Sequence, residues 1–173
     1  MEHFEIKPLH IKDAKSLSAL MLSNNERYSR FFPKTLEQNL SEAASKEYIL
    51  RKDKEIRAKT AFTYAIKEKT KVVGRLIIKN IDQNKKVAEL AYCIDSKHES
   101  KGWMTKAIRE ITNYAFSDLG LEKLQVIVHR SNIGSIKVAE NNTYLWIKTL
   151  EKGYTPPNEE ALDMELYELK SQT

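Results

Sequence analysis

A single polar loop sets the expected architecture, and it reads Asp95-Ser96-Lys97-His98-Glu99-Ser100-Lys101-Gly102-Trp103-Met104-Thr105. A strand-like apolar run ends before it, and a helical pattern begins after it. The first backbone N–H groups of a helix have no partner within the helix, and the helix dipole makes that end positive. The loop therefore predicts an anion site, for which a pyrophosphate is a natural ligand.

Two further features of the loop support an anion site. Gly102 has no Cβ, so we expect its backbone to approach a ligand closely. Lys97, Lys101 and Lys106 add positive charge beside it. A structural strand-to-helix loop without a ligand would look similar, so these residues alone leave both interpretations open.

The segments on either side of the loop predict a strand–helix–strand unit. The helix is expected over Lys101 to Leu119, with one apolar stripe, and Gly120 follows as its C-terminal stop. Leu124, Val126 and Val128 alternate in the next strand. Because a helix crosses over between them, the strands at residues 87–95 and 124–128 are expected to be parallel neighbours.

The rest of the chain predicts further strands and helices in a single domain, residues 1–173. An antiparallel meander is expected at 62–66, 72–79 and 87–95, with an opening strand at 4–9 and closing strands at 144–150 and 161–169. Helices are expected at 13–23, from an N-cap at Thr35 to Leu50, and from an N-cap at Asn132 to about Glu140, with an exposed charged connection at 52–59. The fold class is α/β (α+β): a mixed, mostly antiparallel sheet of about seven strands flanked by about four helices.

Composition narrows the class of protein. The chain has 173 residues, 41% of them hydrophobic, one cysteine, Cys93, and a formal charge of +5. The apolar runs are too short to span a bilayer, and the N-terminus lacks a signal-peptide pattern, so a cytoplasmic protein with no membrane partner is expected. No run of five or six like charges supports nucleic-acid binding, and the histidines lack metal-ligand spacing. The oligomeric state stays open, with a homodimer among the alternatives.

The order of strand, loop, helix and strand, followed by Asn-x-x-Ser, resembles the GNAT superfamily of acetyl-CoA-dependent N-acetyltransferases. Ala88-Glu89-Leu90-Ala91-Tyr92 and Lys101 to Ala107 are similar to the RimJ/RimL-type branch, which acetylates ribosomal-protein N-termini. Asn113 to Lys123 and Asn132-Ile133-Gly134-Ser135 extend the resemblance. It is dense from about residue 86 to 147, whereas the first 60 residues match in layout more than in motif.

The resemblance implies a set of roles. Main-chain groups of Tyr92, Cys93 and Ile94 would hold the pantetheine arm of acetyl-CoA, and Asn132 would also contact it. The pyrophosphate would bind the loop made of Glu99, Ser100, Lys101, Gly102, Trp103, Met104 and Thr105. Ser135 would donate a proton to the departing thiolate, and Glu89 would relay the proton of the amine.

Each of these roles has a structural alternative. Ser135 is also a first-turn helix residue, Asn132 is a good N-cap, and Glu89 fits the outward face of an alternating strand. Tyr144 is an alternative acid, although an aromatic residue in a strand more often belongs to the core. Cys93 is not expected to be a nucleophile, because direct transfer needs no acyl-enzyme.

Departures from the family pattern bear on activity. Glu99 replaces a Gln or Arg, and its carboxylate would repel a pyrophosphate unless it points away. Ser100 replaces a glycine, and Lys106 replaces a glutamate. Where the family has Lys-x-Gly-Phe, Asn142 is expected to take the left-handed turn more readily than Thr143.

The expected function is transfer of an acetyl group to a primary amine, which is a peptide N-terminus or a small amine, by direct attack in a ternary complex. The alternative is an acyl-CoA-binding module with weak or no catalysis. The acceptor itself is not readable from the sequence.

Overall fold

The structure is a computed structural model that describes residues 3–172. The chain divides into two compact units. The first unit holds the described residues up to Ile77 together with Tyr92–Glu99, and the second holds Ile78–Ala91 and the described residues from Ser100 onward. None of the helices in residues 3–172 has the length and apolar character that crossing a membrane requires.

Seven strands form one mixed sheet in the order β1-β2-β3-β4-β5-β7-β6. The strands are β1 (Phe4–Pro8), β2 (Phe62–Glu68), β3 (Lys71–Asp82), β4 (Val87–Ile94), β5 (Lys123–Val128), β6 (Leu145–Tyr154) and β7 (Leu162–Lys170). Pairing is antiparallel between β1 and β2, between β5 and β7, and between β6 and β7. It is parallel between β4 and β5, as the strand–helix–strand pattern predicted. The mixed, mostly antiparallel fold class is therefore confirmed.

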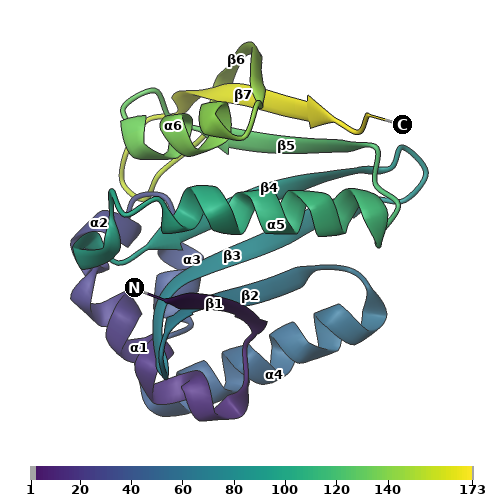
Figure 1. Cartoon of the computed structure of the whole chain (residues 1–173). Helices are drawn as coiled ribbons and strands as arrows, with labels where there is room; N and C mark the ends of the chain where they lie inside the picture. Colours follow the sequence, from purple (N-terminus) through teal and green to yellow (C-terminus); the bar gives the residue numbers. More distant parts are fainter. Residues whose placement is uncertain (1–2, 173) are drawn as a thin grey trace. The chain divides into compact units, whose positions relative to one another are not determined.

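The first unit packs its helices around an apolar core. They are α1 (Ala14–Ser23), α2 (Asn25–Tyr28), α3 (Pro33–Glu37) and α4 (Glu42–Ala58), with short 3-10 helices at Ile11–Asp13 and Ser96–His98. Helices α1 and α4 lie side by side (Figure 1). Leu17 and Met21 of α1 and Tyr48 of α4 are almost wholly buried in this core. The helical spacing of such residues is what predicts an amphipathic helix in the sequence.

Two predictions for this unit are wrong. Thr35 does not cap a long helix: it lies inside the short α3, which begins at Pro33. The long helix starts later, because the Ser41 hydroxyl accepts the backbone N–H of Ala44 and extended backbone precedes it. The charged residues 52–59 are not a connection, since α4 continues to Ala58 and ion pairs such as Arg57–Asp53 support its polar face.

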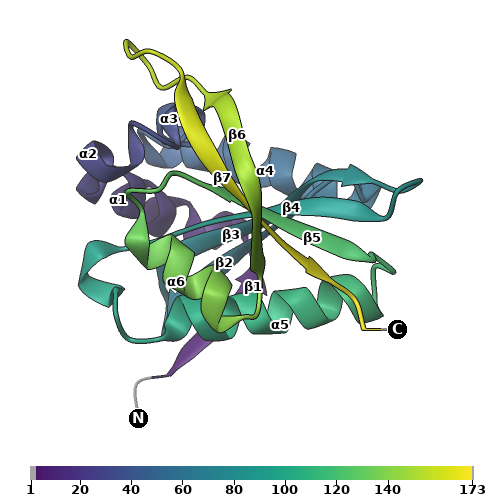
Figure 2. The same ribbon diagram turned by 90° about the horizontal axis from the view of Figure 1, so that it is seen from above.

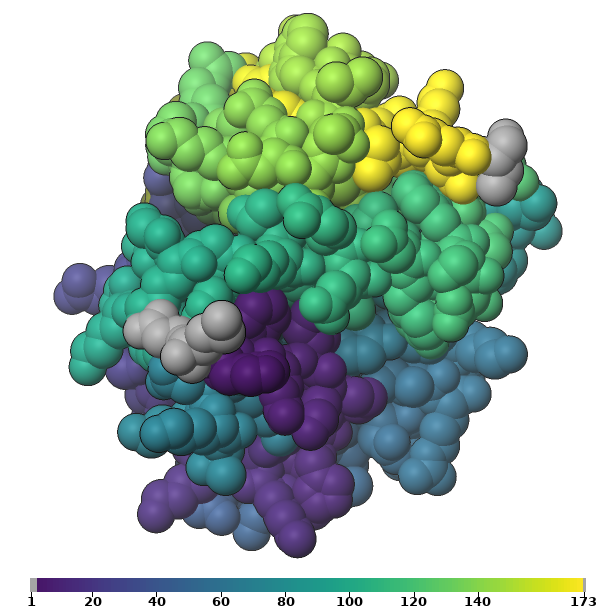
Figure 3. Space-filling model, in the orientation of Figure 1, coloured from purple at the N-terminus to yellow at the C-terminus, as the bar shows by residue number. Residues whose placement is uncertain are grey.

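The second unit contains the two helices at whose starts the sequence predicts cofactor contacts, α5 (Trp103–Ser117) and α6 (Ile133–Asn141), and they lie next to each other. The predicted stripe of α5 is buried, with Ala107, Ile108 and Ala115 completely inaccessible. Strands β6 and β7 run side by side as a long hairpin (Figure 2). Parts of α6 and β6 lie at the surface (Figure 3). Ile133 of α6 and Trp146 of β6 are each 55% exposed.

The end of α6 corrects the expected turn. Thr143, not Asn142, adopts the left-handed conformation, with φ 63° against −102°. Asn142 is used differently: it is buried, and its side-chain amide donates to Thr105 O at 3.0 Å and to Val138 O at 2.9 Å. Because those two bonds fix Asn142, the positive φ falls on the next residue, a β-branched one that disfavours it.

We expect Thr143→Gly to stabilise the protein by about 1 kcal/mol, because glycine removes the strain of a left-handed β-branched residue. Urea unfolding followed by circular dichroism measures the change in the free energy of unfolding. Lys137→Gly, at an exposed position inside α6, is the control and should destabilise by about 1 kcal/mol. A loss of stability in Thr143→Gly comparable to that of the control would contradict this account.

Candidate active site

Helix α5 begins without a side-chain cap. Its N-cap is Gly102, whose φ is +74°, and no side chain accepts a hydrogen bond there. The first turn contains no acidic residue that would occupy the positive end of the helix dipole. The Lys101 ammonium lies over the Trp103 ring at 5.1 Å, which keeps a positive charge beside the helix start. This arrangement suits an anionic ligand held by backbone N–H groups.

Backbone conformation, more than close packing, explains the glycine at 102. A Cβ built on Gly102 would meet nothing within 4 Å, so the protein itself does not crowd this position. The positive φ is the constraint that L side chains disfavour. Ser100, with φ 61°, takes a second left-handed conformation two residues earlier, without the benefit of glycine.

The rest of the loop is held by side chains that point inward. Trp103 and Met104 are buried at 4% and 6% exposure. The Thr105 carbonyl accepts the Asn142 amide at 3.0 Å, which ties the first turn of α5 to the end of α6. These anchors leave the backbone, and not the side chains of Trp103 and Met104, as the surface that a ligand can use.

The start of α6 also has the expected cap. The Asn132 Oδ1 accepts the Ser135 backbone N–H at 3.2 Å, so the capping role of Asn132 is present. Because its oxygen is used by the helix, the side-chain nitrogen is the group left to donate to a ligand. Ser135 lies in the first turn and is half-buried.

Glu89 is held firmly on β4. Its Oε1 lies 3.3 Å from Lys79 Nζ, and its Oε2 accepts the Asn80 amide at 2.9 Å. Its in-register neighbour on β5 is Gln125, which donates to Glu168 Oε1 at 2.7 Å. Glu89 is therefore a fixed carboxylate in a polar row across the sheet of the second unit.

The other predicted residues belong to the first unit, at the end of β4 and just after it. Tyr92 and Cys93 are buried at 7% exposure, so their main chains rather than their side chains could serve a ligand. The Ile94 carbonyl is already used: it accepts the Tyr28 hydroxyl at 2.6 Å and Arg27 Nη1 at 3.2 Å. Burial, and after it the nearby Cys93 thiol, raises the pKa of Tyr28 well above its usual range. The phenol therefore stays protonated and donates its hydrogen bond.

Glu99 does not present a bare carboxylate. Arg27 Nη2 forms an ion pair with its Oε1, and the same guanidinium donates to Asn24 Oδ1 at 2.8 Å. The negative charge at the start of the loop from Glu99 to Thr105 is therefore neutralised from α2.

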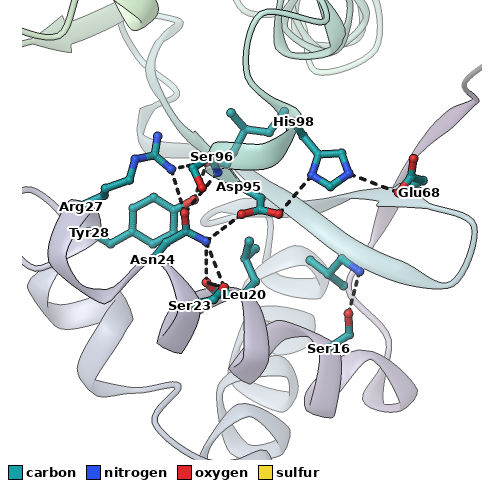
Figure 4. A network of polar contacts seen from close by, with 12 residues as sticks. Ser16, Leu20, Ser23, Asn24, Arg27, Tyr28, Glu68, Asp95, Ser96 and His98 are labelled. Carbon is teal, nitrogen blue, oxygen red and sulfur yellow. Dashed lines mark hydrogen bonds and ion pairs between the residues drawn. The ribbon is translucent and has the colours of Figure 1, made fainter.

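A buried amide holds this region together (Figure 4). Asn24 is 2% exposed. Its Nδ2 donates to Leu20 O at 3.0 Å and to Asp95 Oδ1 at 3.1 Å, and its Oδ1 accepts from Arg27 and from the Ser96 N–H. One side chain thus joins α1, α2 and the residues that follow β4.

A second chain of contacts continues from Asp95 (Figure 4). His98 Nδ1 lies 3.1 Å from Asp95 Oδ2, and His98 Nε2 lies 3.2 Å from Glu68 Oε2. Burial opposes ionisation of Asp95, but hydrogen bonds from Asn24 and His98 outweigh it and hold its pKa below its ordinary value.

The alternative acid, Tyr144, belongs to the core. It is 1% exposed, and its hydroxyl shares a 2.8 Å hydrogen bond with Thr112 on α5. Burial raises the pKa of Tyr144 well above its usual range, so the phenol is a poor proton donor.

Sequence reasoning missed three supporting residues, Asn24, Arg27 and Tyr28, and it missed the contacts of a fourth, Asn142. Three of them act on residues about 70 positions away, and no local pattern signals such a contact. Asn142 was singled out only as a turn former, because its spacing to Thr105 carries no periodic signal.

The chain matches the family model described as an acetyltransferase (GNAT) domain over residues 3–143. It therefore belongs to the GNAT acetyltransferases, whose co-substrate is acetyl-CoA. The YdaF protein of Bacillus subtilis, provisionally named a ribosomal N-acetyltransferase, is 27% identical over 146 residues, or 83% of this chain and 79% of its own.

Solved structures share the fold. The ribosomal-protein-S5-alanine acetyltransferase from Vibrio fischeri superposes with a TM-score of 0.91 at 18% identity, over 99% of this chain and 95% of that one. The microcin C7 self-immunity acetyltransferase MccE, in complex with acetyl-CoA and AMP, gives a TM-score of 0.87 at 21% identity, over 99% and 94%.

Asp95 gives a prediction about pH. A group whose pKa is lower in the folded state stabilises the fold above its unfolded pKa, and this contribution is lost as the pH falls through the folded value. We expect the wild type to be more stable than Asp95→Asn by about 1–2 kcal/mol at pH 7. The difference should shrink below about pH 3.8, the ordinary value for this group. Urea unfolding between pH 7 and pH 2.5 measures both, and a constant difference over that range would show that the charge of Asp95 contributes nothing.

Proposed function

We propose that the protein transfers the acetyl group of acetyl-CoA to a primary α-amine, that of a peptide N-terminus or a small amine, by direct attack in a ternary complex. The uncapped start of α5 at Gly102 carries the donor side of this proposal. The two units would act as one acetyltransferase domain, residues 1–173, since the family match covers parts of both. A peptide N-terminus is favoured because relatives are named as ribosomal N-acetyltransferases.

The proton chemistry favours an α-amine over a lysine side chain. At pH 7.5 about a quarter to two-fifths of α-amines with an ordinary pKa are already neutral, against about one lysine in a thousand. A fixed carboxylate such as Glu89, acting through water, then needs to deprotonate only the part of the α-amines that is still charged. Ser135 would protonate the departing thiolate, and a backbone N–H of β4 would stabilise the oxyanion. Holding both substrates together supplies much of the rate.

The proposed cofactor contacts come from the start of α5, the start of α6 and strand β4. The backbone from Ser100 to Thr105 would hold the pyrophosphate, Asn132 would contact the pantetheine arm, and main-chain groups of β4 would pair with that arm. The alternative, a binding module with little catalysis, drew on the departures in the loop, among them Glu99 and Ser100. The Arg27–Glu99 ion pair weakens one of these reasons, the charge of Glu99.

An acetyl-CoA assay with a panel of peptides and small amines tests the function through release of the CoA thiol. Turnover is expected with at least one α-amine. Tight acetyl-CoA binding without thiol release from any acceptor would instead support the binding module.

In the same assay Ser135→Ala should lower kcat at least tenfold and leave the affinity for acetyl-CoA unchanged. The control Ser131→Ala, four residues earlier, should leave kcat unchanged. Unchanged kcat in Ser135→Ala would remove Ser135 from the mechanism.

The Arg27–Glu99 pair gives a second prediction. Arg27→Gln should weaken acetyl-CoA binding about three- to fivefold, because the Glu99 carboxylate is no longer neutralised, and the effect should diminish at high salt. The double variant Arg27→Gln/Glu99→Gln should bind nearly as the wild type does. Isothermal titration calorimetry measures all three. If the double variant is as weak as Arg27→Gln, then Arg27 acts through its other contacts and not through Glu99.

A further inference from the structure

One buried cation in the first unit lacks a negative partner. Arg75 on β3 is only 4% exposed. Its Nη1 donates to the Tyr48 hydroxyl at 3.1 Å, but its Nε has no hydrogen-bond partner among the described residues. No carboxylate within residues 3–172 forms an ion pair with it either. The guanidinium is therefore charged, buried and incompletely satisfied.

Such a group is costly for a fold to keep. Burying a charge without a counter-charge opposes folding strongly, and arginine cannot escape the cost by losing its proton. The same unit shows the usual solution at Lys67, whose ammonium lies 2.6 Å from the buried Asp13 carboxylate. Arg75 departs from this rule, which points to a counter-charge that arrives with a ligand.

The surroundings fit a small planar anion. The Phe32 ring lies over the guanidinium at 5.7 Å and is itself only half-buried. Burial opposes the charge of Arg75, but the Tyr48 phenol and the Cys93 thiol, neither of which is a carboxylate, outweigh it and hold the pKa of Arg75 above its ordinary value. A free Nε edge is one side of the fork with which arginine binds carboxylates.

We infer that Arg75 binds a carboxylate of the acceptor, so the acceptor is an amine that also carries a carboxylate. The inference rests on the proposed function, because Cys93, which acts on Arg75, belongs to the segment proposed to hold the pantetheine arm. Arg75 would orient the acceptor and fix its class, while the amine chemistry stays with the groups described above.

Stability of the ligand-free protein is the first test, and it does not require activity. Arg75→Met removes an unsatisfied buried charge, so its melting temperature should rise by about 2 °C or more. Lys67→Met is the matched control: it strands the Asp13 carboxylate and should lower the melting temperature. If Arg75→Met lowers the melting temperature as the control does, the fold itself satisfies Arg75 and the inference is overturned.

Specificity for the acceptor is the second test. Alanylalanine and alanylalanine amide differ only in the carboxylate, and both offer an α-amine. For the wild type, kcat/KM should favour the free acid about tenfold or more, and Arg75→Met should abolish that preference. Arg75→Lys should keep part of it, because the charge remains while the fork is lost. Affinity for acetyl-CoA should not change in either variant.

The outcomes separate the two proposals. Equal use of both dipeptides by the wild type and by Arg75→Met overturns the Arg75 assignment and leaves the acetyltransferase function intact.

If neither dipeptide is acetylated, the melting temperature is measured in sodium acetate and in sodium chloride at equal ionic strength. A rise in melting temperature specific to acetate in the wild type, absent in Arg75→Met, supports the anion site. The lack of such a rise overturns it, as would loss of acetyl-CoA binding in Arg75→Met.

Discussion

Helix α5 begins at a residue that can adopt a left-handed conformation but cannot cap the helix. Gly102 supplies the positive φ, and without a side chain it offers no oxygen to the N–H groups that follow. Trp103 and Met104 are then buried, and Asn142 holds the Thr105 carbonyl, so the first turn is rigid although its N–H end has no cap. A rigid helix start without a side-chain cap and with a lysine nearby suits a pyrophosphate, because the backbone N–H groups are positioned before the ligand arrives.

The supporting residues of the first unit differ in whether their charge is neutralised within the fold. Glu99 would oppose an anion at this loop, and Arg27 neutralises it while also contacting Asn24 and the Ile94 carbonyl. Asn24, fully enclosed, satisfies its oxygen and nitrogen within the same network. Arg75 is the contrast, since its charge is buried and its Nε is left without a partner in the described part of the chain. Arg27 and Asn24 therefore satisfy each other within the first unit, whereas Arg75 and the neutral Thr63 hydroxyl each keep a buried polar atom without a hydrogen-bond partner in residues 3–172.

The sequence predicted the parts of the fold that local patterns encode. The stripe of α5, the alternation of β5 and the Asn132 cap all follow from spacing, and the parallel pairing of β4 with β5 follows from the crossover helix. It failed where alternatives were locally equivalent: Thr35 and Ser41 are both good N-caps, and tertiary bonds to Asn142 moved the left-handed turn to Thr143. The contacts of Asn24 and Arg27 depend on long-range packing, which no single stretch of sequence records. The roles of Glu89 and Ser135 remain predictions that rest on the family resemblance.

Amide hydrogen exchange with and without acetyl-CoA tests the central claim most directly. Binding of the pyrophosphate at the start of α5 should slow exchange at the amides of Gly102 to Thr105, and leave exchange at the start of α4, near Ser41 to Ala44, unchanged. Saturating acetyl-CoA that binds the protein but leaves the amides of Gly102 to Thr105 as exposed to exchange as before would contradict the account.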